Sequence, residues 1–147
     1  MIDRKHIGRA FGPYVAEVEK SRVRFFAKAI GETSPVFRDE AAARDAGFSA
    51  IPVPPTFLFC LAGDPDDPFH MLDVMDIDLG RVLHGEQSFT YHAPVHVGDR
   101  LVFSERVTDI YDKKGGALEF VVMDVEGRKH DGTLVVEMRK TLVVRNG

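Results

Sequence analysis

The sequence predicts an α+β fold: a single domain, residues 1–147, in which a curved antiparallel sheet wraps one central buried helix. Two observations predict it. Residues 57–62 are a short run without charged side chains, too short to cross a bilayer, so other elements have to cover it. From Arg81 onward, apolar residues recur at every second position, which is the pattern of strands with one buried face.

The composition is that of a globular protein with one core. Its apolar fraction is 44% and its net charge is -4, which excludes the basic face that nucleic acid requires. Residues 1–6 are charged and lead into no apolar signal-peptide core, so we expect a cytoplasmic protein that does not enter a membrane. Cys60 is the one cysteine and is predicted to be an inert buried thiol.

The first half is expected to hold a short strand and two helices. Alternation predicts a strand at residues 14–19, and Asp39 and Gly47 are placed to begin and end a small helix. A longer helix, with Ser21 as its N-cap and Gly31 at its end, is predicted from apolar residues at i, i+3, i+4 and i+7: Val23, Phe26, Ala27 and Ile30. Residues 63–80 are expected to form a loop without an element, acting as a lid or a mobile connection.

The second half predicts a meander of about four strands. Turns are expected at residues 113–116 and at Asp131-Gly132. Within each strand that these turns separate, apolar residues share one parity: Leu101, Phe103, Val107 and Tyr111, then Leu118, Phe120 and Val122, then Leu134, Val136, Met138, Leu142 and Val144. Such a sheet has long edge strands, and pairing with a second copy or a related subunit would cover them.

Prolines precede the buried run and suggest a ligand contact at its start. Pro55 suits the first turn of a helix, where a missing N–H costs nothing. The next donors, the amides of Thr56 and Phe57, would then point out of a buried helix end toward a ligand oxygen. Both are candidate substrate-binding residues.

Three stretches resemble the MaoC-like dehydratases of the N-terminal, fatty-acid-synthase-like type. They are residues 26–40, residues 51–57, and residues 83–94 followed by Gly98-Asp99. The resemblance implies a hot-dog fold and the addition or removal of water across the double bond of an acyl thioester. The carrier would be coenzyme A or acyl carrier protein.

The resemblance also locates a gap in the catalytic motif. Complete members carry Gly-Asp-x-Asn-Pro-(Ile or Leu)-His, whose Asp and His handle the water and the proton. Here Glu32 stands at the Asp position, Ser34 at the Asn position and Phe37 at the His position. A phenyl ring transfers no proton, so the chain resembles the half of a two-subunit enzyme that shapes the acyl channel while its partner supplies the chemistry.

The remaining candidates lie in the third stretch. His84 and Glu86, two apart on a strand, are expected to share a face and to act as acid and base, or to form a polar knot with Gln87. Gln87 is also a candidate substrate contact. Glu32 is either a remnant water-orienting carboxylate or a solvated residue. No third ligand follows at a metal-site spacing, so we expect neither a metal nor another cofactor.

Three functions therefore stay open. The first is a subunit of an enoyl-thioester hydratase or 3-hydroxyacyl-thioester dehydratase, paired with itself or with a related hot-dog subunit. The second is an acyl-CoA binding module without activity. The third is a hot-dog thioesterase, in which a carboxylate attacks or activates water at the carbonyl. The resemblance of residues 83–94 favours the first over the third, and Phe37 leaves the isolated chain incomplete.

Overall fold

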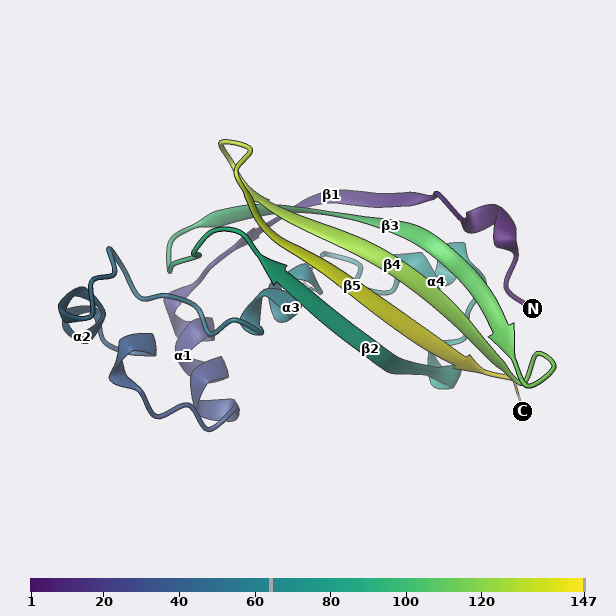
Figure 1. The fold of residues 1–147 in the computed structure, drawn as a ribbon, viewed down its shortest axis with the longest axis horizontal. Helices are drawn as coiled ribbons and strands as arrows, with labels where there is room; N and C mark the ends of the chain where they lie inside the picture. Colours follow the sequence, from purple (N-terminus) through teal and green to yellow (C-terminus); the bar gives the residue numbers. More distant parts are fainter. Residues whose placement is uncertain (64, 147) are drawn as a thin grey trace.

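The computed structural model describes residues 1–63 and 65–146 and confirms the α+β class (Figure 1). Short helices and one strand precede a run of four long strands. The strands are β1 (Ala10–Glu17), β2 (Val82–Tyr91), β3 (Arg100–Lys113), β4 (Leu118–Lys129) and β5 (Leu134–Arg145). The helices are α1 (Lys20–Ala29), α2 (Glu40–Asp45), α3 (Phe57–Ala62) and α4 (His70–Val74), with 3-10 turns η1 (Arg4–His6), η2 (Pro35–Phe37) and η3 (Leu79–Arg81).

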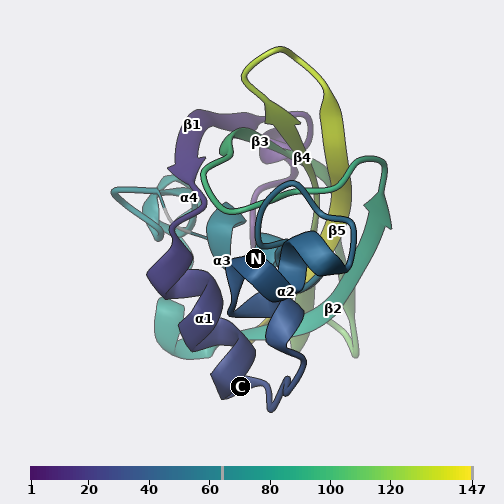
Figure 2. The ribbon, with the colours of Figure 1, turned by 90° about the vertical axis from the view of Figure 1, so that its left-hand side faces the viewer.

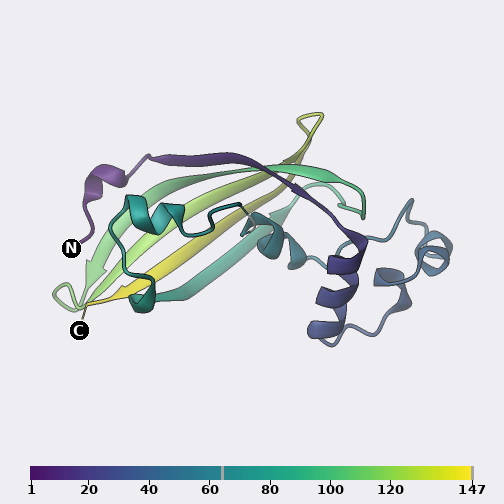
Figure 3. The same cartoon turned by 180° about the vertical axis from the view of Figure 1, so that it is seen from behind.

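The sheet is antiparallel, in the order β1-β3-β4-β5-β2, so β1 and β2 are its two edges. It curves around α3, which Figure 2 shows nearly end-on inside the sheet. Figure 3 shows α3 and α4 over the same face, with α1 beyond one end of the strands. The predicted wrapping of a sheet around a central helix is confirmed.

Three local expectations were wrong or incomplete. The first strand begins at Ala10, and α1 is preceded by Glu19 as its N-cap residue, since the helix already includes Ser21. The predicted loop at 63–80, of which Asp64 lies outside the described residues, contains α4 and η3. This segment packs on the sheet because Leu72, Met75 and Ile77 bury apolar side chains in a cluster with residues of β3, β4 and β5. The predicted Asp39 cap is confirmed, since its carboxylate accepts from the Ala42 amide.

The core consists of two clusters side by side on the concave face. One surrounds α3 and includes Phe57, Leu58, Leu61 and Phe103. The other lies under α4 and includes Leu72, Val107, Ile110 and Val121. The boundary between these clusters is where polar side chains enter the interior.

The buried run is less enclosed than predicted. Phe57, Leu58 and Leu61 are almost fully buried, but Phe59 is 38% exposed. The expectation that other elements cover the whole run 57–62 was therefore wrong at Phe59. The reason is that α3 covers the sheet with one side only, and Phe59 projects from its open side, where its ring meets His84 edge-on at 5.1 Å between centroids.

Candidate functional site

Two charged residues interrupt the apolar concave face. Glu105 of β3 lies opposite Val125 of β4, and Lys140 of β5 lies opposite Met123 of β4. Lys140 Nζ reaches across β4 and donates to Glu105 Oε1 at 2.8 Å. Glu105 is 8% exposed, so the pair lies at the buried boundary between the two core clusters.

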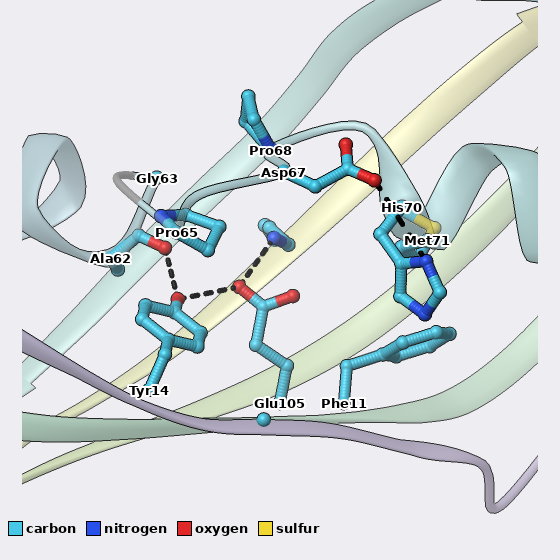
Figure 4. Close-up of a pocket in the computed structure, with 12 residues that line it drawn as sticks. Phe11, Tyr14, Ala62, Gly63, Pro65, Asp67, Pro68, His70, Met71 and Glu105 are labelled. Carbon is cyan, nitrogen blue, oxygen red and sulfur yellow. Dashed lines mark hydrogen bonds and ion pairs between the residues drawn. The ribbon is translucent and has the colours of Figure 1, made fainter.

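Tyr14 of β1 joins this pair to the central helix (Figure 4). Its hydroxyl donates to the Ala62 carbonyl, a group that α3 leaves free at its C-terminus. The hydroxyl oxygen also lies 3.4 Å from Glu105 Oε1. Burial, and then the neighbouring Glu105 charge, raise the pKa of Tyr14 far above its ordinary value, so it remains a neutral donor.

A cavity of about 370 Å³ opens beside the pair. It lies between the end of α3, α4 and strands β2 to β5, and its volume is within the usual range for small-ligand sites, about 300–1,000 Å³. Most of its lining is apolar, including Phe59, Met71, Leu72, Leu79, Met138 and Leu142. Its polar lining consists of His84, Gln87, Glu105 and Lys140, with the Cys60 thiol at the helix.

A second cavity, of about 120 Å³, lies nearer β1. Phe11, Tyr14 and His70 line it, and it shares both Glu105 and Lys140 with the larger cavity (Figure 4). The Glu105–Lys140 pair thus borders two cavities at once. A group bound in either one would meet these charges.

His84 and Gln87 face the larger cavity, but Glu86 is exposed and does not line it. The expectation that His84 and Glu86 share a face was wrong. A β-bulge breaks the register with β5 between these two residues, at Gly85, so the alternation of faces restarts there. The Gln87 amide nitrogen donates to the Ser88 carbonyl, and its Oε1 is buried without a hydrogen-bond partner in the described chain.

Glu32 lies apart from this site. It follows α1, lines neither of the two cavities, and its carboxylate accepts from the Ser34 amide at 2.8 Å. The Arg38 guanidinium donates to its carbonyl oxygen. Phe37, at the end of η2, is half-buried. The structure does not bring Glu32 together with His84 around one cavity.

The start of α3 offers fewer free donors than predicted. The Phe57 amide donates to the Pro54 carbonyl at 2.9 Å, so the expectation that it is free was wrong. The Phe57 N–H is already used in the turn that begins at Pro54, so it is not available to a ligand. Thr56 precedes the six-residue helix, and its role in substrate binding stays a prediction.

Tyr14, Glu105 and Lys140 were missed from the sequence, although a signal was present. Glu105 falls between Phe103 and Val107, at the parity of the predicted inward face, and Lys140 falls between Met138 and Leu142 in the same way. A charged residue at an inward strand position indicates a partner across the sheet. The same pattern could have identified both residues as a buried pair.

The described residues give no support for a reactive cysteine, a metal site or a membrane-spanning helix. Burial raises the pKa of the Cys60 thiol, which disfavours a reactive thiolate. Within residues 1–63 and 65–146, no three His, Cys, Asp or Glu side chains are grouped to hold a metal ion. No helix of that same part is long and apolar enough to cross a membrane.

The chain is similar to known proteins in both sequence and structure. Residues 5–138 match the family model described as the FAS1-like dehydratase domain region. A UPF0336 protein of Saccharopolyspora erythraea is 36% identical, covering 98% of this chain and 92% of its own.

Two solved structures from Mycobacterium tuberculosis are also similar. The HadBC (3R-hydroxyacyl-ACP dehydratase) complex contains a chain with a TM-score of 0.78 and 28% identity, covering 93% of this chain and 96% of that one. The ChsH1-ChsH2 complex contains one with a TM-score of 0.74 and 25% identity, covering 94% and 89%. The R-hydratase PhaJ1 of Pseudomonas aeruginosa, at 18% identity and a TM-score of 0.72, shares the fold.

These matches confirm both the hot-dog fold and the resemblance to MaoC-like dehydratases. The family model spans nearly the whole chain, and the relatives match it over similar lengths. The chain is therefore a hot-dog protein of the dehydratase/hydratase kind, and it belongs to the FAS1-like dehydratase domain family.

Proposed function

We propose that this chain is one subunit of an acyl-thioester hydratase/dehydratase, in which it shapes the acyl channel while a hot-dog partner supplies the acid and the base. The observation that carries the proposal is Phe37, a half-buried phenyl ring at the motif position where a histidine is needed. A positioned acid or base typically contributes about 10²–10⁴-fold to the rate, and a phenyl ring contributes none of it.

The larger cavity supports the proposed role of this chain as a wall of the acyl channel. Its lining is mostly apolar, it opens beside the buried helix α3, and it has a volume suited to a small ligand. His84 and Gln87 on β2 place polar groups at its side, where they would contact a bound acyl thioester. The thioester would come from acyl-CoA or from acyl carrier protein.

The edges of the sheet support a partner of the same fold. β2 is a ten-residue edge strand without proline, and it exposes Leu83 and Tyr91. β1 contains Pro13, which has no N–H to offer to a neighbouring strand. We therefore assign the subunit contact to the free edge of β2, together with the exposed Phe59 on α3. The similar HadBC and ChsH1-ChsH2 chains come from complexes of two named components.

The test is a hydration assay with crotonyl-CoA. The purified chain alone is expected to show turnover close to background. Mixing it with a hot-dog subunit from the same organism that carries the motif Asp and His is expected to give activity well above that of either chain alone.

Two variants separate this proposal from its rival, in which His84 and Glu86 act as acid and base. His84→Ala and Glu86→Gln are assayed in the lone chain beside the unmodified protein. Robust turnover by the unmodified chain that either substitution abolishes would overturn the channel-subunit proposal. Equal, background-level rates in all three proteins are the expected result.

A further inference from the structure

Stability gives no reason for a charged pair at the centre of the concave face. Glu105 is flanked on β3 by Phe103 and Val107, and Lys140 is flanked on β5 by Met138, all of them buried and apolar. The residues opposite the pair on β4, Val125 and Met123, are buried and apolar as well. Replacing a buried ion pair with apolar residues of similar volume is often neutral or stabilising. Positions that break the local pattern in this way tend to be functional.

The pair has hydrogen-bonding capacity that the protein does not use. Lys140 makes one hydrogen bond within the described chain, to Glu105 Oε1, although an ammonium group has three donors. Glu105 Oε2 accepts none from residues 1–63 or 65–146. Gln87 lies directly opposite Lys140 in the register of β2 with β5, and its Oε1 also lacks a partner there.

An acyl chain with an unsubstituted hydrocarbon tail would leave this hydrogen-bonding capacity unused. A saturated chain that filled the larger cavity would displace water from Lys140 and Glu105 and return no hydrogen bond. A hydroxyl or oxo oxygen on the acyl tail would accept a hydrogen bond from Lys140, and a hydroxyl would also donate one to Glu105. Because the two charges cancel, a neutral oxygen suits the pair better than an anion, which Glu105 would repel.

We propose that Lys140 and Glu105 select acyl chains that carry a hydroxyl or oxo group along the tail, in addition to the oxygen that hydration itself places beside the thioester. The inference rests on the proposed function for its thioester substrate. It adds the position of a specificity-determining pair, on β5 and β3, and the chemical class of tail that this pair recognises.

Direct binding to the unmodified chain tests the inference. The probes are octanoyl-, lauroyl- and palmitoyl-CoA, each compared by calorimetry with its ω-hydroxy derivative, so that chain length moves the oxygen along the cavity. The matching free fatty acids and ω-hydroxy fatty acids form a second series that does not depend on the carrier. At one length or more, the hydroxylated probe is expected to bind about tenfold or more tightly than the saturated one.

Two double variants complete the design. Glu105→Gln with Lys140→Met removes both charges of the pair at once and is expected to abolish the preference for the hydroxylated probe. Asp124→Asn with Arg139→Met removes an exposed ion pair, 2.6 Å between Arg139 Nε and Asp124 Oδ1, from strands β4 and β5 and is expected to keep the preference. Thermal unfolding confirms that each variant is folded.

The outcomes distinguish the two proposals. Equal or weaker binding of every hydroxylated probe, or a preference that persists in the Glu105/Lys140 variant, would overturn the inference and leave the proposed function standing. A preference among the fatty acids without binding of any acyl-CoA would support oxygen recognition and count against a CoA thioester substrate. Failure of every probe to bind would contradict both.

Discussion

At the scale of single residues, two phenylalanines of α3 show how position determines a side chain's contribution to stability. Phe57 is 2% exposed and packs edge-on against Phe26, whereas Phe59, two residues later, is 38% exposed. Both belong to the apolar run 57–62, for which the sequence predicts cover by other elements. Only one of them contributes as a core residue.

Truncation of Phe57 and Phe59 should therefore differ in cost. Phe57→Ala is expected to lower the free energy of unfolding by about 3–5 kcal/mol, the range for buried phenylalanine. Phe59→Ala, its matched control, is expected to cost about 1 kcal/mol, as for a typical point substitution. Urea unfolding followed by circular dichroism measures both. Equal costs would mean that α3 is not packed as described.

The buried pair makes a second prediction at this scale. Lys140→Met alone leaves the Glu105 carboxylate buried without its cation and is expected to cost about 3–5 kcal/mol of unfolding free energy. Adding Glu105→Gln removes the uncompensated charge and is expected to recover most of that loss. A double-mutant cycle by urea unfolding checks this, and additive costs would contradict a direct interaction.

At the scale of elements, the bulge in β2 determines what the strand presents to the cavity. Without it, His84 and Glu86 would share a face. With it, His84 and Gln87 line the cavity. Gly85 sits at the bulge because a side chain there would meet Val143 Cγ2 at 2.7 Å and the Thr141 carbonyl oxygen at 3.2 Å. Glycine is thus required by close packing against β5.

Gly85→Ala is accordingly expected to destabilise the protein by about 1–3 kcal/mol, the usual cost of overpacking. Gly63→Ala is the control, since a Cβ there would have ordinary contacts of 3.5 Å or more. Thermal unfolding of the two variants provides the comparison. A neutral Gly85→Ala would show that β2 can shift away from β5 at little cost.

At the scale of the whole molecule, the two edges of the sheet are not equivalent. β1 and β2 each expose an apolar side chain, Val15 at 55% and Leu83 at 48%. Only β2 borders the larger cavity. The proposed subunit contact therefore predicts that charge on β2 matters more than charge on β1.

Leu83→Glu is expected to weaken association by tenfold or more, whether the partner is a second copy or a related hot-dog subunit. Val15→Glu introduces the same charge at a similarly exposed position on β1 and is expected to leave association unchanged. Sedimentation velocity on each variant, alone and with the partner subunit, measures this. Equal effects at both edges would contradict the assignment of the contact to β2.

The α+β class, the family and the incomplete catalytic motif can all be predicted from the amino-acid sequence. These depend on signals that neighbouring residues carry: period-two alternation in residues 101–144, turn residues such as Asp131-Gly132, and Phe37 within its motif. Such signals do not require knowledge of which strands pair, because each is carried by residues that are close together in the chain.

Which side chains come into contact depends on the tertiary structure. Glu105 and Lys140 are 35 positions apart and join across an intervening strand, and this depends on the register of β3, β4 and β5. The bulge at Gly85 likewise exchanged Glu86 for Gln87 at the cavity. Strand register and bulges follow from packing across the sheet, so a one-residue shift reverses the faces without altering the local pattern.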